Sequence, residues 1–222
     1  MADHLQEEEQ LDAIKQWWQE NRASVIGAVV LTLGGSFGWS QYQDYTASNA
    51  VAAADAYDAI LLEREGGESV DQLAALAQSL RDESGSVIFA EFAALQVAAA
   101  AAQDGNFELA KTELETVMAG VEFDSTLGQL TQLRLAKVKA ALGQEGDAIA
   151  MLEMGSDSFP VSYAQALGDI HLAAGREAAA LEAYQTAQTA SLALGGQSGL
   201  IDLKVSGLSL RGEQMVTEDL SQ

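Results

Sequence analysis

A run of 21 residues without one charged side chain, residues 23–43, constrains this sequence more than any other feature. The run reads ASVIGAVVLTLGGSFGWSQYQ, and a helix of roughly 20 apolar residues is long enough to cross the hydrocarbon core of a bilayer. Trp17 and Trp18 precede it, and Trp39 and Tyr42 lie at its far end. Tryptophan and tyrosine concentrate at the two membrane interfaces. We therefore predict one transmembrane helix over residues 23–43.

Two other interpretations of this run remain open. A buried helix of a soluble domain seldom stays uncharged on all sides over such a length. A cleavable signal peptide starts with a short basic segment, whereas 22 residues of net acidic character precede this run. The alanine-rich stretch after Asn49 nevertheless offers cleavage sites for a signal peptidase.

Basic residues near the ends of a span predict its orientation, because lysine and arginine stay on the cytoplasmic side. Lys15 and Arg22 precede the run, and no basic residue follows it until Arg64. We predict a cytoplasmic segment over residues 1–22, with a short helix along the membrane surface, and a large domain over residues 44–222 on the other side.

Two glycines four residues apart, Gly34 and Gly38, lie within the predicted span. Such a step lets two helices approach closely in lipid. It indicates either a contact with a second membrane helix or the ordinary glycine frequency of transmembrane helices.

Beyond the run, the sequence favours helices throughout. Hydrophobic residues make up 48% of the chain, alanine and leucine dominate them, and Pro160 is the only proline. Alanine and leucine are the best helix formers and proline the worst. The predicted fold class is all-α.

Three turn glycines share one phase: Gly105, Gly143 and Gly175 lie 38 and 32 residues apart. This spacing brackets the tetratricopeptide period of about 34 residues. Small residues recur seven positions before and five positions after each glycine, and they let paired helices cross closely. They are Ala98, Ala136 and Gly168, and Ala110, Ala148 and Ala180. We expect Pro160 to mark the end of the second helix of its hairpin.

A further hairpin over residues 45–64 and 70–80 and a last helix over residues 200–210 complete the predicted architecture. This is a tetratricopeptide-like α-solenoid of about four helical hairpins. The alternative is a chance series of alanine-rich hairpins.

The first helix of each pair lines a concave groove in such solenoids, and we expect this groove to bind partners. The alternative for each residue is surface exposure or packing between repeats. The candidates are Phe92, Leu95, Gln103, Leu133, Lys137, Gln165, Asp169 and Leu172.

Charge and composition exclude several functions. The net charge is −22 with 11 lysines and arginines, which disfavours nucleic acid as a partner. The absence of cysteine excludes disulfides and thiolate metal sites. The only histidines are His4, in the N-terminal segment, and His171, which we expect to be packed and not a ligand. No catalytic motif is present, so we expect no enzyme, no cofactor and no metal.

The whole chain resembles the YfgM family, most specifically in the pre-membrane stretch EQLDAIKQWWQEN and the C-terminal stretch IDLKVSGL. The resemblance implies a single-pass inner-membrane protein with a periplasmic tetratricopeptide domain, acting as an ancillary subunit of the SecYEG translocon. It further implies association with the membrane-anchored periplasmic chaperone PpiD, help for emerging secretory and outer-membrane proteins, and restraint of a cytoplasmic stress-response regulator. The alternative function is a periplasmic adaptor for envelope assembly or cell division, unrelated to secretion.

Overall fold

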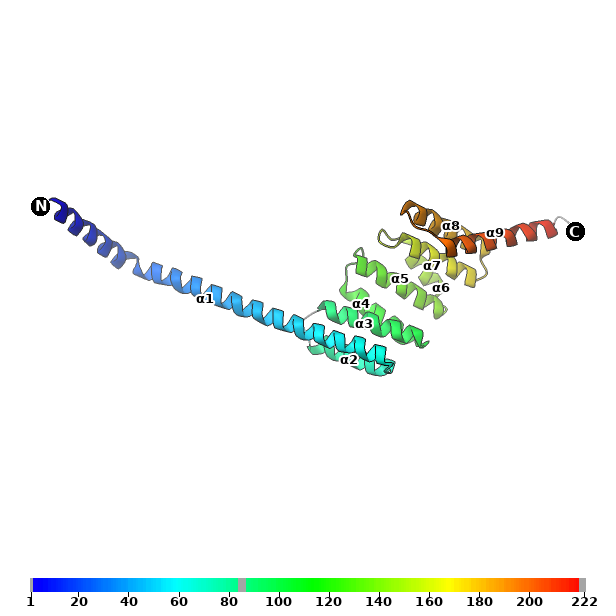
Figure 1. Cartoon of the computed structure of the whole chain (residues 1–222), viewed down its shortest axis with the longest axis horizontal. Helices are drawn as coiled ribbons and strands as arrows, with labels where there is room; N and C mark the ends of the chain where they lie inside the picture. Colours follow the sequence, from blue (N-terminus) through cyan, green and yellow to red (C-terminus); the bar gives the residue numbers. More distant parts are fainter. Residues whose placement is uncertain (1, 84–86, 220–222) are drawn as a thin grey trace. The chain divides into compact units, whose positions relative to one another are not determined.

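The computed structural model describes residues 2–83 and 87–219, and their side chains over residues 14–83 and 87–211. Within these residues all regular secondary structure is helical, which confirms the predicted fold class (Figure 1). The chain divides into two compact units, Met1–Ala52 and Ala53–Gln222. The helices are α1 (Ala2–Gly66), α2 (Val70–Glu83), α3 (Val87–Gln103), α4 (Phe107–Gly120), α5 (Thr126–Ala141), α6 (Glu145–Glu153), α7 (Pro160–Ala173), α8 (Glu177–Ala193) and α9 (Gly199–Asp219).

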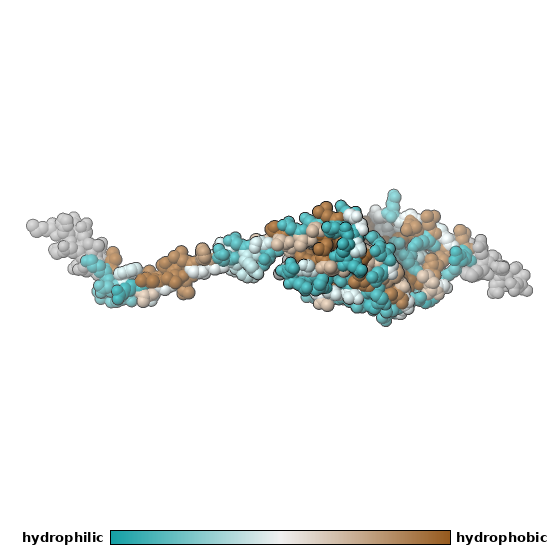
Figure 2. Space-filling model, turned by 90° about the horizontal axis from the view of Figure 1, so that it is seen from below, coloured by the Kyte–Doolittle hydropathy of each residue, from teal (hydrophilic) through white to brown (hydrophobic). Residues whose placement is uncertain are grey.

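The first unit consists of the N-terminal part of α1. Most of its large apolar side chains are exposed, from 46% at Trp18 to 77% at Leu31, and Figure 2 shows a brown band on the helix. By length and composition this is the one helix in the described part of the chain that is able to cross a membrane. An apolar surface of this size is stable only when lipid or protein covers it.

One helix occupies the region where the sequence predicted a short pre-membrane helix, a membrane helix and the first repeat helix. No proline and no helix-ending turn interrupts residues 2–66, so the helix continues across both predicted boundaries. The side chains of His4 and of Glu7 to Glu9 lie outside the described residues. An added Cβ at Gly34 or Gly38 would meet nothing within 4 Å, so a contact of these glycines with a second helix stays a prediction.

The second unit is a series of antiparallel hairpins: the end of α1 with α2, then α3 with α4, α5 with α6 and α7 with α8, followed by α9 (Figure 1). The three predicted turn glycines all have positive φ, between +73° and +79°. At Gly143 the turn closes through hydrogen bonds from Gly143 N to Ala140 O (3.0 Å) and from Gln144 N to Lys139 O (2.9 Å). This Schellman arrangement needs a left-handed residue at the glycine position.

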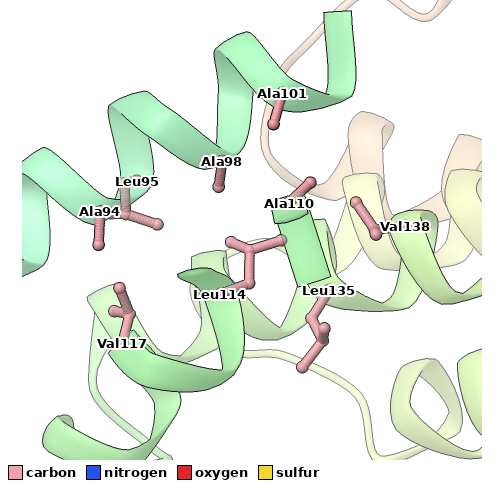
Figure 3. Packing of buried hydrophobic residues seen from close by; sticks show 9 residues of the cluster. All are labelled: Ala94, Leu95, Ala98, Ala101, Ala110, Leu114, Val117, Leu135 and Val138. Atoms are coloured by element: carbon pink, nitrogen blue, oxygen red, sulfur yellow. The ribbon is translucent and has the colours of Figure 1, made fainter. Parts of the chain in front are cut away.

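The small residues of the repeat pattern lie between paired helices. Figure 3 shows Ala98 and Ala101 pointing from α3 toward Ala110 and Leu114 of α4. Ala110, Ala136, Ala148 and Ala180 are all 0% exposed. Because side chains of one methyl group fill these contacts, the helices approach closely and larger residues fill the space between hairpins.

Pro160 does not end the second helix of its hairpin, as the sequence predicted. That helix, α6, already ends at Glu153, and Pro160 is the first residue of α7. Proline suits the first position of a helix, because the N–H it lacks would have no partner there and its φ is already helical.

Candidate interaction groove on the repeat domain

A depression of about 370 Å³ lies between α5 and α7, the first helices of two successive hairpins. Alanines form much of its walls, and their short side chains leave the space open. Lys137 and Asp169, two of the predicted groove residues, line it from opposite helices. The alanines are Ala140 and Ala141 of α5 and Ala166 and Ala173 of α7.

Asp169 belongs to a polar cluster that joins α7, α8 and α9. The hydroxyl of Tyr184 donates to Asp169 Oδ1 over 2.6 Å, and Lys204 forms an ion pair with the same carboxylate. The Lys204 ammonium also lies 4.9 Å from the ring centre of Tyr184, a cation–π arrangement. Burial, and next the hydrogen bond to the Asp169 carboxylate, raise the pKa of Tyr184 above its usual range. The negative charge of Asp169 is therefore balanced within the fold.

The second carboxylate of the groove, Glu145, is balanced in the same way. Arg176 donates from Nη1 and Nη2 to Glu145 Oε2, both over 3.3 Å, and its Nε donates to His171 Nδ1 over 2.9 Å. His171 is half-buried and accepts this hydrogen bond through an unprotonated Nδ1. The guanidinium thus connects the start of α6 to the end of α7.

Two basic residues of α5 have no ion pair or hydrogen bond among the described side chains: Arg134 and Lys137. Both are exposed, whereas Lys139 of the same helix pairs with Asp147 at 3.5 Å and Glu115 at 4.0 Å. The groove therefore carries a cation, Lys137, that forms no ion pair within the described part of the chain.

Leu95 and Leu133 were predicted to face the groove, and this prediction is wrong. Each is 6% exposed and belongs to a hydrophobic core cluster. They occupy equivalent repeat positions where one hairpin packs against the next. Two leucines are more stable in such a contact than on a solvated surface.

The remaining candidates do not join one surface. Phe92 is half-buried, with its ring centre 6.2 Å from that of Tyr57 of α1. Gln103 is exposed but lines a different depression, near Arg64. Gln165 and Leu172 are half-buried, and Leu172 packs against the cluster that α8 and α9 share. Of the eight candidates, Lys137 and Asp169 are the two that share the α5–α7 groove.

A hydrogen-bond network that the sequence interpretation missed positions α5 against α7. The Tyr163 hydroxyl donates to Gln129 O (2.7 Å) and lies 3.1 Å from Gln132 Oε1. Gln132 donates in turn to Met151 O over 2.6 Å. Burial raises the pKa of Tyr163 to about 12. The sequence carried no clear signal for this network, because α5 also contains exposed polar residues such as Arg134 and Lys137, and nothing in the sequence marks the two glutamines as the buried ones.

Hairpins stacked at tetratricopeptide spacing define a helical-repeat protein of the tetratricopeptide class. The family model described as a tetratricopeptide repeat-like domain matches residues 15–209. Proteins named ancillary SecYEG translocon subunit are similar over most of their length, and the chain belongs to their family, the YfgM family, as the sequence resemblance indicated. No solved structure matches the chain.

Three of these relatives illustrate the similarity. The protein of Aggregatibacter actinomycetemcomitans is 32% identical over 211 residues, which are 94% of this chain and 100% of the relative. The protein of Haemophilus influenzae is 31% identical over 189 residues, 85% of this chain and 91% of the relative. The protein of Escherichia coli is 25% identical over 207 residues, 92% of this chain and 97% of the relative.

Proposed function

We propose that this protein is an ancillary, non-enzymatic subunit of the SecYEG translocon, anchored in the inner membrane by one helix. The observation that carries the proposal is the extent of the similarity to proteins of that name, which spans the apolar helix as well as the repeats. A repeat solenoid binds other proteins through extended surfaces. Such a surface close to the channel would meet proteins as they emerge.

The membrane span in this proposal covers residues 23–43. Lys15 and Arg22 on its N-terminal side, against none on the other side before Arg64, favour a cytoplasmic segment over residues 1–22. The repeat domain over residues 44–222 is then periplasmic. A net charge of −22 suits this placement, because it keeps the domain away from anionic lipid headgroups.

The proposed partners follow from the same placement. On the periplasmic side, the repeat domain binds a membrane-anchored chaperone of the PpiD type and passes emerging secretory and outer-membrane proteins to it. On the cytoplasmic side, residues 1–22 restrain a stress-response regulator. The α5–α7 groove supports the first of these roles, because it offers apolar walls and an unbalanced charge to a partner segment.

The test is purification of the tagged full-length protein in mild detergent, followed by mass spectrometry of the proteins that accompany it. A variant without residues 1–43 is the control. Channel subunits and a membrane-anchored chaperone with the full-length protein alone would support the proposal. Envelope-assembly or division proteins in place of channel subunits would refute it and favour the adaptor function.

A further inference from the structure

We infer that the α5–α7 groove binds a partner segment that presents a carboxylate next to a large apolar side chain, with Lys137 and Arg134 as the countercharges. This inference rests on the proposed function as a scaffold that binds proteins, and it adds the chemical class of the segment. The inference starts from a depression with alanine walls that lies beside two cations without a partner among the described side chains.

The first observation concerns how the lysines and arginines of the repeat domain are paired. The second unit contains nine lysines and arginines. Seven of them bond to side chains of the same unit, and six of these seven pair with carboxylates. Arg134 and Lys137 are the two others, in a chain with a net charge of −22. With carboxylates so abundant, two cations without a partner among the described side chains mark a place where an external anion fits.

The position of the two cations is the second argument. They lie three residues apart on the exposed face of α5, so their side chains are neighbours on the helix surface. Lys137 lines the groove directly. The two groove carboxylates, Asp169 and Glu145, do not cancel its charge, because Lys204 and Arg176 already pair with them. Lys137 is therefore the charged residue of the groove lining that has no partner among the described side chains.

The shape and lining of the depression give the third argument. Its volume of about 370 Å³ and its walls of alanine and Ile170 provide apolar surface for one large side chain. Apolar burial supplies affinity, and a charge beside it fixes the orientation of the segment. A second copy of this chain fits poorly, because two bodies of charge −22 repel each other. The occupant is thus a segment with one or two carboxylates from a partner that is not itself strongly acidic.

The experiment uses the full-length protein in nanodiscs of neutral phosphatidylcholine and a library of short random peptides displayed on phage. Peptides enriched by the wild-type protein are synthesised, and their affinities are measured by fluorescence anisotropy. We expect Asp or Glu beside Leu, Phe or Met among them. We expect Lys137→Gln to weaken binding up to about fivefold and the Arg134→Gln/Lys137→Gln variant about tenfold, the scale of exposed charge pairs.

A charge-matched control is Lys111→Gln, which removes an equal charge at a site on α4 paired with Glu108 and should leave affinity unchanged. Replacing the peptide's Glu with Gln should reproduce the loss on the wild-type protein and cause no further loss on the double variant. Peptides without acid dependence, no binding peptides at all, or an equal loss with Lys111→Gln would overturn the inference.

The two proposals fail in different ways. If channel subunits accompany the purified protein but groove peptides bind independently of charge, the translocon function stands and the inference is wrong. If acid-dependent peptides bind but no channel subunit accompanies the protein, the groove chemistry stands and the proposed function is wrong.

Discussion

Replacing Gly168 of α7 with alanine tests how closely α7 and α8 are packed. An added Cβ would lie 2.6 Å from both Cδ1 and Cε1 of Tyr184 and 3.0 Å from its Cζ, well inside van der Waals contact. The Tyr184 ring is 0% exposed. Its hydroxyl bonds to Asp169 on one side, and Lys204 lies against its ring. The ring therefore has no space to move into without losing these contacts.

The expected effect is the sum of three terms. Overpacking a buried site costs about 1–3 kcal/mol. Loss of the hydrogen bond to the Asp169 carboxylate, if the ring shifts, costs a further ~1.5 kcal/mol or more. Alanine in a helix is more favourable than glycine by about 1 kcal/mol. We expect Gly168→Ala to destabilise the repeat domain by about 1.5–3.5 kcal/mol, which lowers the Tm by about 2–4 °C per kcal/mol in a domain of this size.

The control is the same substitution at Gly207, an exposed position in α9 where an added Cβ meets nothing within 4 Å. Gly207→Ala keeps the helix-propensity gain and lacks the clash, so it should stabilise by up to about 1 kcal/mol. Urea unfolding of both full-length variants in detergent, followed by circular dichroism, gives the two free energies. If Gly168→Ala is as stable as Gly207→Ala, the packing argument is refuted. Tyr184→Leu in the Gly168→Ala protein should recover part of the loss, because it removes the ring.

Two further outcomes follow from burial. Ala148→Leu places a large side chain at a site that is 0% exposed and should destabilise the domain by about 1–3 kcal/mol. The control is Ala150→Leu, at an exposed position of the same helix, which should change the stability little. An unchanged Tm for Ala148→Leu would show that the repeat phase is misassigned. Because burial raises the pKa of Tyr163 to about 12, the unfolded chain, with a tyrosine pKa near 10, loses this proton first. The contribution of Tyr163 to the free energy of unfolding should thus be constant below about pH 10 and fall as the pH rises toward 12. The decline should be shallower in Tyr163→Phe, and equal slopes for the two proteins in urea titrations would contradict the assignment.

The helices and their turns were predictable because their signals are local. A glycine at the end of a helix, such as Gly105, adopts the left-handed conformation that closes the helix, and alanines at fixed distances from it mark the crossing of the two helices. Pro160 shows the limit of such a local signal. Proline is compatible with the loop after one helix and with the start of the next, and the end of α6 at Glu153 depends on Gly155, whose φ is +77°.

The groove was less predictable because it depends on contacts between hairpins. Repeat phase assigns a residue to a face of its helix, but a change of one position rotates the side chain by about 100°. Leu95 and Leu133 lie at the border between the groove face and the hairpin contact, and the contact buries both. Lys137, one turn further along α5, stays exposed. The repeat phase therefore placed two of the eight candidates, Lys137 and Asp169, at the α5–α7 depression, and partner binding there stays a prediction.

Polar pairs one repeat apart explain which cations remain unpaired. Arg81 pairs with Glu113, 32 residues later, and Asp169 pairs with Lys204, 35 residues later. Each of these pairs joins one hairpin to the helix pair or helix that follows it. Lys137 lies 32 residues before Asp169, so repeat spacing alone would pair these two residues. Lys204 of α9 forms the ion pair with Asp169 instead. The last helix thus covers the end of the solenoid and supplies the cation that pairs with Asp169, while Lys137 has no partner among the described side chains.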